Sequence, residues 1–269
     1  MVGKPTFSSG LITSIGESAF SDCKDLTGIE IPSSVTSLGE YVFSECSSLT
    51  HITIPNSVTN MGRQAFCGCG KLVDIQLSNS ITTIGEATFQ DCSSLKSLDL
   101  PNSIKTMDSY VFIGCTSLTS ITIPNSVTTI GGGFFDNCTS LTSVVFGSSL
   151  ATIGYKIFEG CDSLTKLVCY ALVPPKDDKK EYNSWMFGFD QSKCTVYVPQ
   201  ASFVYYQVVD GWGKFNYTEP IETDLKNVNV DPASEQERFG LDGKRLSSQR
   251  NGLNIVRKSD GTTSKVMVK

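Results

Sequence analysis

Seven cysteines follow one another along this chain at intervals of 23 residues. A phenylalanine precedes each of them by three positions and a leucine follows each by three, so that three columns of residues share one period. The cysteines of the series are Cys23, Cys46, Cys69, Cys92, Cys115, Cys138 and Cys161. A constant period of about 20–29 residues is typical of a solenoid, because a unit this short cannot bury its own apolar side chains. The sequence therefore predicts a stack of coils in which equivalent side chains meet one coil apart.

One 23-residue unit from the middle of the series indicates what each coil contains. Leu118–Ile123 has the form L-x-x-I-x-I, whose β-branched residues and alternation favour a short strand. Pro124 ends this strand, because proline cannot donate to a β-ladder. A second extended stretch reaches Ile130, and glycine recurs at the corner that follows it, with Asp108 as the only break in the glycine column. We expect a short helical or 3₁₀ turn to bring Phe135 inside the coil.

The repeat L-x-x-I-x-I-P-x-S-V-T-x-I-G-x-x-A-F-x-x-C resembles the leucine-rich repeat of the BspA-like, or Treponema-type, surface proteins. Leu49–Cys69 and Leu72–Cys92 match this pattern most clearly. The resemblance covers roughly residues 11–217, because Tyr205-Tyr206 and Asp210-Gly211-Trp212 resemble the terminal repeat and cap of that family. It implies a non-enzymatic extracellular or cell-surface binding protein, of a kind often linked to adhesion to host proteins.

Three segments are expected from the pattern of charge and repeats. Residues 1–217 form the leucine-rich repeat solenoid with its cap, residues 218–237 a polar linker, and residues 238–269 a small β-hairpin module. The module carries eight basic and two acidic residues, a net charge of +6, which leaves −11 for the rest of a chain whose total is −5. Asp-Gly pairs at 242–243 and 260–261 predict two tight hairpins. This tail resembles the C-terminal β-modules of exported Bacteroidetes proteins, which in part of that group are sorting signals.

Composition excludes several classes of function. A net charge of −5 is unlike that of a general nucleic-acid binder, and no stretch approaches the roughly 20 apolar residues that cross a bilayer. The sequence has no P-loop, no H-E-x-x-H motif and no Ser-His-Asp arrangement, and its only histidine is His51. We therefore expect a monomer that is not an enzyme and has no cofactor or metal. No signal peptide is visible, so an export signal would lie outside this sequence.

The cysteine column admits two interpretations. Equivalent positions on adjacent coils lie about 5 Å apart, which is within the Cα range of a disulfide. A bridge would strain the regular coil, however, whereas a small and weakly polar residue fits the inward corner of a leucine-rich coil. We therefore predict that the seven repeat cysteines are reduced and buried, that Cys169 is buried as well, and that Cys194 is the most accessible thiol.

The x positions of L-x-x-I-x-I should face outward and form a continuous binding surface. They run from Thr27, Gly28 and Glu30 on the first coil to Thr165, Lys166 and Val168 on the last. The later coils carry mostly Thr, Ser and Val, whereas the earlier coils depart from this background. The candidate ligand-binding residues are therefore Glu30, His51, Asp74, Gln76 and Asp99. Their carboxylates favour a protein partner with a basic surface.

The charged segment 176–193 departs from the family pattern and supplies a further candidate, Trp185. We expect it to form a loop with Trp185, Met186 and Phe187 packed onto the last coil. Two alternatives to a protein-binding surface remain open: a structural spacer or envelope component, and a glycan binder that uses this loop. A regular threonine array could also match ice or a polysaccharide, but β-propensity explains the threonines, and the columns lack the stacked aromatic residues of a carbohydrate platform.

Overall fold

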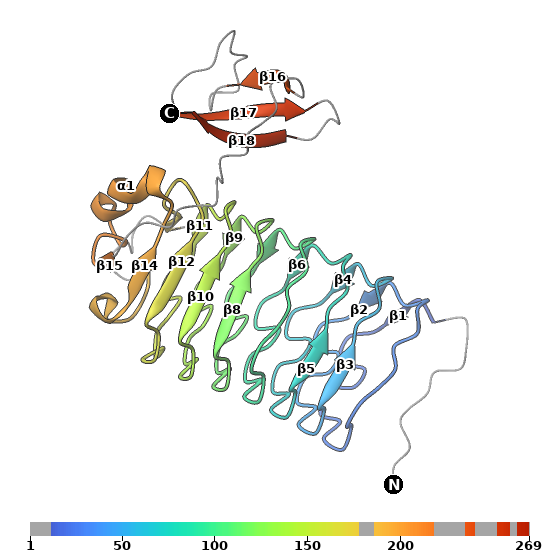
Figure 1. Ribbon diagram of the computed structural model, residues 1–269. Helices are drawn as coiled ribbons and strands as arrows, with labels where there is room; N and C mark the ends of the chain where they lie inside the picture. The colour runs from blue at the N-terminus through green and yellow to red at the C-terminus, as the bar shows by residue number, and fades with distance from the viewer. Residues whose placement is uncertain (1–11, 178–185, 218–234, 240–251, 259–262, 269) are drawn as a thin grey trace. The chain divides into compact units, whose positions relative to one another are not determined.

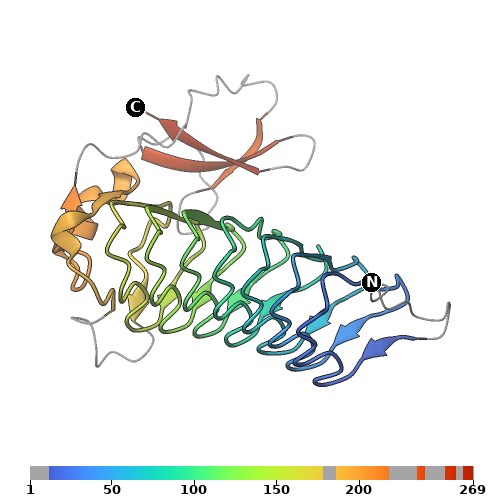
Figure 2. The ribbon, with the colours of Figure 1, turned by 90° about the horizontal axis from the view of Figure 1, so that it is seen from below.

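The computed structural model describes residues 12–177, 186–217, 235–239, 252–258 and 263–268. They belong to two compact units, Met1–Pro220 and Ile221–Lys269, which are considered separately. The first unit is a parallel β-solenoid of about nine turns with a spacing of roughly 23 residues. Its coils follow one another in sequence order (Figure 1 and Figure 2). The predicted fold class, a solenoid of leucine-rich repeats, is confirmed.

Two sides of each coil are extended. The first, which we call the sheet face, carries the L-x-x-I-x-I segments, and its strands are β3 (His51–Thr53), β5 (Asp74–Gln76), β8 (Ser120–Ile123), β10 (Ser143–Phe146), β12 (Lys166–Cys169), β14 (Thr195–Tyr197) and β15 (Asn216–Tyr217). The second strand face carries β1 (Ser14–Ile15), β2 (Ser37–Leu38), β4 (Asn60–Met61), β6 (Thr83–Ile84), β7 (Thr106–Met107), β9 (Thr129–Ile130), β11 (Thr152–Ile153) and β13 (Lys176–Asp177). All strand pairs between coils are parallel. In most of these pairs the two partners are 23 residues apart, as in Ser120↔Ser143↔Lys166.

The third side of each coil consists of turns, so the expected helical or 3₁₀ turn is wrong. Alternate backbone N–H groups donate to the next coil instead of to their own turn: Tyr110 N to Gly132 O (2.9 Å), Phe112 N to Phe134 O (3.0 Å) and Gly114 N to Asp136 O (2.8 Å). This third ladder needs two left-handed residues in each coil, as at Tyr110 (φ 61°) and Gly114 (φ 73°). The ladder bonds offset the strain that a left-handed backbone imposes on residues other than glycine.

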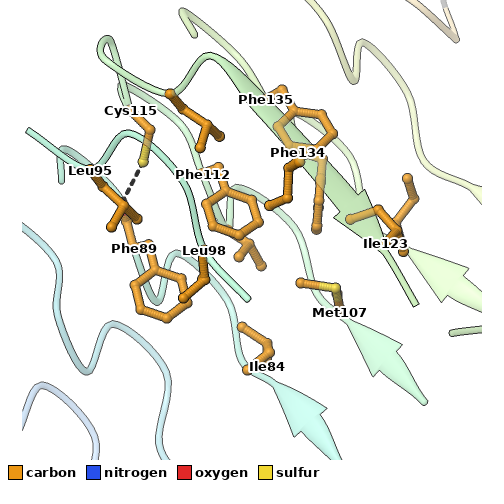
Figure 3. Packing of buried hydrophobic residues seen from close by; sticks show 14 of the residues in the cluster. Ile84, Phe89, Leu95, Leu98, Met107, Phe112, Cys115, Ile123, Phe134 and Phe135 are labelled. Carbon is orange, nitrogen blue, oxygen red and sulfur yellow. Dashed lines mark hydrogen bonds between the residues drawn. The ribbon is translucent and has the colours of Figure 1, made fainter. Parts of the chain in front are cut away.

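Phenylalanine forms the continuous centre of the core. From Phe20 to Phe158, adjacent rings of the column lie 5.4–5.8 Å apart between centroids and are nearly parallel. Figure 3 shows three of them, Phe89, Phe112 and Phe135, surrounded by buried aliphatic side chains. The column continues beyond the regular repeats, because the Phe187 ring stacks on Phe158 at 6.3 Å. The core is therefore one stack of equivalent side chains, as the 23-residue period predicts.

The cysteine column lies beside the phenylalanines and is held by hydrogen bonds. All ten cysteines are free thiols. From Cys46 onward, each Sγ of the column donates to the backbone carbonyl of the phenylalanine 26 residues earlier, at 3.0–3.3 Å. The bond from Cys115 is the dashed line in Figure 3. The predicted buried and reduced state holds for six of the seven, whereas Cys23, in the first described coil, is exposed. Cys194 is buried, contrary to the expectation that it is accessible.

Thiol labelling should separate these positions. Burial raises the pKa of Cys46 and of Cys194 to about 12, so their thiolates are scarce at neutral pH. In native protein we expect a thiol reagent to label Cys23 rapidly and the half-buried Cys67 slowly. The eight buried cysteines should react only after denaturant is added. Mass spectrometry of the labelled protein checks this, and rapid native labelling of more than two thiols would contradict it.

A cap closes the C-terminal end of the solenoid. It contains the 3₁₀ turns η2 (Gln191–Lys193) and η3 (Gln200–Ser202), helix α1 (Phe203–Val208) and strand β15. Trp212 is fully buried, and its Nε1 donates to Pro175 O at 2.9 Å, while the Tyr206 hydroxyl donates to Ala171 O at 2.9 Å. Met186 and Phe187 are 2% exposed and pack on the last regular coil, as expected.

The described residues of the second unit form three antiparallel strands, β16 (Glu235–Phe239), β17 (Gly252–Lys258) and β18 (Thr263–Val268), in the order β16-β17-β18. β16 begins inside the segment expected to be a linker. The Asp-Gly pairs expected at the hairpin tips lie outside the described residues, as does most of that linker. Within the described part of the chain, no helix is long and apolar enough to cross a bilayer.

Candidate binding surface on the sheet face

The structure places five of the six candidate residues on the sheet face, and all five are exposed. Two rows run across the coils there. His51 pairs with Asp74 in one row, and in the other Thr53 pairs with both Glu30 and Gln76. Asp99 is one coil beyond Gln76 in the repeat, so it continues the second row. The sixth candidate, Trp185, lies outside the described residues.

Two residues expected to face solvent are buried. Gly28 lies beneath the His51 ring, so that a Cβ atom there would be 3.3 Å from both Cε1 and Nε2 of that ring. The His51 ring therefore lies along the sheet, and its Nδ1 is 3.1 Å from the Thr50 hydroxyl. Val168 is 8% exposed, because its register partners Val145 and Tyr197 flank it on the two neighbouring strands. The outward surface is thus less regular than the repeat alone predicts.

The sheet face is interrupted in the middle of the solenoid. Leu95–Leu100 forms no strand, although its pattern predicts one, and the face splits into a two-stranded sheet, β3-β5, and a five-stranded sheet that starts at β8. Figure 1 draws no arrow on this face for the coil between β5 and β8. The segment has Leu98 and Leu100 where the next coil has Ile121 and Ile123, and it has Lys96 and Asp99 where that coil has Thr119 and Thr122. All of these have lower β-propensity than the isoleucines and threonines of that coil.

The stack is also looser just before the interruption. The spacing from Phe66 to Phe89 is 5.8 Å, the largest step in the phenylalanine column, and Cys92 Sγ lies 3.3 Å from Phe66 O against 3.0–3.1 Å for its equivalents. On the second strand face, β4 and β6 belong to separate sheets. Among the described residues, the Leu72–Cys92 coil therefore lacks one strand ladder toward each of its two neighbouring coils.

Two adjoining hollows occupy the interruption. The acidic hollow has a volume of about 450 Å³, and its lining includes Asp74, Gln76, Asn79, Asp99, Leu100 and Pro101. The neutral hollow, so named because every residue that lines it alone is uncharged, has a volume of about 490 Å³, and these residues include Asn102, Ser120, Thr122, Pro124, Ser143 and Val145. The two share Ser97, Leu98, Asp99 and Leu100. The structure thus brings Asp74, Gln76 and Asp99 together and leaves Glu30 and His51 outside the hollows.

The linings of the two hollows show which groups could contact a ligand. Asp74 and Asp99 give the acidic hollow two carboxylates, and neither hollow has a lysine or arginine in its lining. Among the described residues, no group of three or more His, Cys, Asp and Glu could hold a metal ion. Neither lining contains a histidine or cysteine to act as a base or a nucleophile. What the hollows offer a ligand is charge, amide and hydroxyl groups, and apolar contact.

Sequence reasoning missed the residues of the neutral hollow. Ser120, Thr122 and Val145 occupy ordinary x positions, and only the leucines at 98 and 100 signal that the neighbouring strand fails. It also missed Tyr197, whose ring lies 5.3 Å from the Lys166 ammonium in a cation–π contact. The signal for Tyr197 is its x position in the terminal Thr-Val-Tyr-Val strand.

Comparison with known proteins agrees with this architecture. The family model of the BspA-type leucine-rich repeat region matches residues 13–132 and 105–199, in six copies. The chain belongs to the BspA-type leucine-rich repeat family. This BspA-type chain is 31% identical to a leucine-rich repeat protein of T. pallidum of known structure, over 57% of this chain and 72% of that one, with a TM-score of 0.53.

Further solved structures resemble the BspA-type chain less closely. A leucine-rich repeat protein from Bacteroides ovatus is 26% identical over 71% of this chain and 65% of that one, with a TM-score of 0.39. A leucine-rich cell surface protein from Faecalibacterium prausnitzii is 18% identical over 81% of this chain and 87% of that one, with a TM-score of 0.34. None of the curated proteins compared matches the chain.

Proposed function

We propose that this protein is a non-enzymatic binding protein of the cell surface or the extracellular space, and that it recognises a protein partner through its sheet face. Leucine-rich repeat proteins are typically scaffolds for protein interaction, and no catalytic family matches the chain. The observation that carries the proposal is the pair of adjoining hollows at the interrupted coil, which line up across several strands of an exposed face.

A polypeptide suits these hollows better than a glycan. Carbohydrate platforms present flat aromatic rings, whereas neither hollow has an aromatic residue in its lining. The lining alternates carboxylate, amide and hydroxyl groups with Leu100, Pro101, Pro124 and Val145, the mixture of polar and apolar contacts found at protein interfaces. The proposed location at the surface rests on the resemblance of the repeats to those of surface proteins.

Selection from a random peptide library displayed on phage tests the binding function. The bait is the purified protein, and the blocked variant is Ser97→Trp, because Ser97 is exposed and lines both hollows. Thr128→Trp, at an exposed position on the second strand face, is the matched control. We expect enriched peptides to bind the wild type and Thr128→Trp but not Ser97→Trp. Failure to enrich any peptide, or equal binding to both variants, would overturn the proposal.

A further inference from the structure

The interruption leaves main-chain groups without partners at the hollows. Where the sheet is regular, Ile54 N donates to Gln76 O at 2.8 Å. The equivalent bonds one and two coils later would join Leu77 N to Asp99 O and Leu100 N to Thr122 O. Neither bond forms among the described residues, and all four of these residues line the hollows. Backbone N–H and C=O groups are obligatory hydrogen-bonding groups, so water or a ligand must satisfy them.

We propose that the acidic hollow receives an arginine or lysine side chain from an extended segment of the protein partner, and that the neutral hollow receives an uncharged side chain of the same segment. The unpaired main-chain groups at Leu77, Asp99 and Leu100 then bond the backbone of that segment. This inference rests on the proposed function and specifies the chemistry of its partner.

Charge and shape both favour a basic side chain in the acidic hollow. Asp74 and Asp99 supply two carboxylates, and the Gln76 side-chain oxygen can accept a further hydrogen bond. Leu100 and Pro101 offer an apolar wall against which the aliphatic stem of arginine or lysine can pack. Among the described residues, Lys96 of the same coil lines neither hollow and forms no ion pair with Asp74 or Asp99. Arginine suits the site best, because its planar fork of donors can bond two acceptors at once.

The spacing of the hollows sets the spacing of the two side chains. The hollows share one coil, so their centres lie one to two coil spacings apart, roughly 5–10 Å. Side chains at positions i and i+2 of an extended peptide lie on one face, about 7 Å apart. The partner segment should therefore carry its basic residue and its uncharged residue two positions apart.

Synthetic peptides test this chemistry directly. The probe is a fluorescein-labelled nonapeptide with arginine at its centre and valine two positions later, and its counterpart has neutral, nearly isosteric citrulline in place of the arginine. Fluorescence polarisation with the full chain should give a Kd at least about tenfold lower for the arginine peptide than for citrulline. The ratio should fall to about one in Asp74→Asn/Asp99→Asn. The control Glu17→Gln/Glu86→Gln, which loses two exposed carboxylates away from the sheet face, should keep the wild-type ratio.

The outcomes separate this inference from the proposed function. If library peptides bind the sheet face but arginine and citrulline peptides bind equally, the inference fails and the proposed function stands. If the ratio falls equally in both double variants, general charge attraction explains it and the inference also fails. If no peptide binds the sheet face at all, both fail. Thermal melts of each variant confirm that it is folded, and the preference for arginine should weaken as salt concentration rises.

Discussion

Replacing Phe112 by alanine should destabilise the solenoid by about 3–5 kcal/mol. The ring is fully buried and contacts its neighbours in the column, Phe89 at 5.5 Å and Phe135 at 5.7 Å between centroids, and meets Phe134 edge-on. A cavity at this point removes contacts from the coils on both sides, and in a solenoid those contacts hold one half of the stack to the other. Denaturation by guanidinium chloride, followed by circular dichroism, measures the change in the free energy of unfolding.

Phe20→Ala is the matched control for this variant. Phe20 belongs to the same column but is only partly buried; it stands at the end of the described stack, where its ring lies 5.4 Å from that of Phe43. Its replacement should cost clearly less than that of Phe112. Equal losses in the two variants would contradict the view that continuous stacking stabilises the core.

Replacing Gly154 by valine should cost about 3 kcal/mol or more, or prevent folding, because it overpacks a site closed by backbone. A Cβ atom at Gly154 would lie 2.2 Å from the backbone nitrogen of Gly132 on the preceding coil. The glycine is therefore required by close approach, and only a separation of the coils could make room. Asp108 stands in the same column, so one coil does accommodate a side chain, and the cost depends on the local approach.

Gly16→Val provides the comparison for the Gly154 variant. Gly16 is the first glycine of the column, and nothing lies within 4 Å of a Cβ atom built there. An exposed substitution of this kind usually changes stability by less than about 0.5 kcal/mol. Melting temperatures of the two variants measure the contrast, and similar values for both would show that the coils do not close upon the glycine column.

Positions that repeat in every coil were enough to predict the core. The 23-residue period predicts the burial of three columns of side chains, represented by Phe112, Cys115 and Leu118. The structure agrees with expectation most closely in the interior of the coils. Cys23 is exposed, whereas the other cysteines of its column are buried, and the repeat pattern alone does not predict this difference. In the first described coil, which has a described neighbour on one side, the same residue type at the same position is exposed.

The candidate binding surface was harder to predict, because it depends on a departure from the repeat. Leu98 and Leu100 satisfy the apolar pattern as well as isoleucine does, and the whole scale of β-propensity spans only about 1 kcal/mol. Whether the strand forms is then decided by contacts with the coils on either side. Left-handed turn residues such as Tyr41 and Ala87 carry no signal either, since their conformation is imposed by bonds to the neighbouring coil.

The most direct test of this account is a crystal structure of the protein bound to an arginine peptide obtained by the library selection. The peptide should cross Ser97–Leu100 in an extended conformation, with its basic side chain between Asp74 and Asp99. Its backbone should bond the main-chain groups of Leu77, Asp99 or Leu100. A peptide seated on the second strand face, on the turns or on the cap would contradict the account.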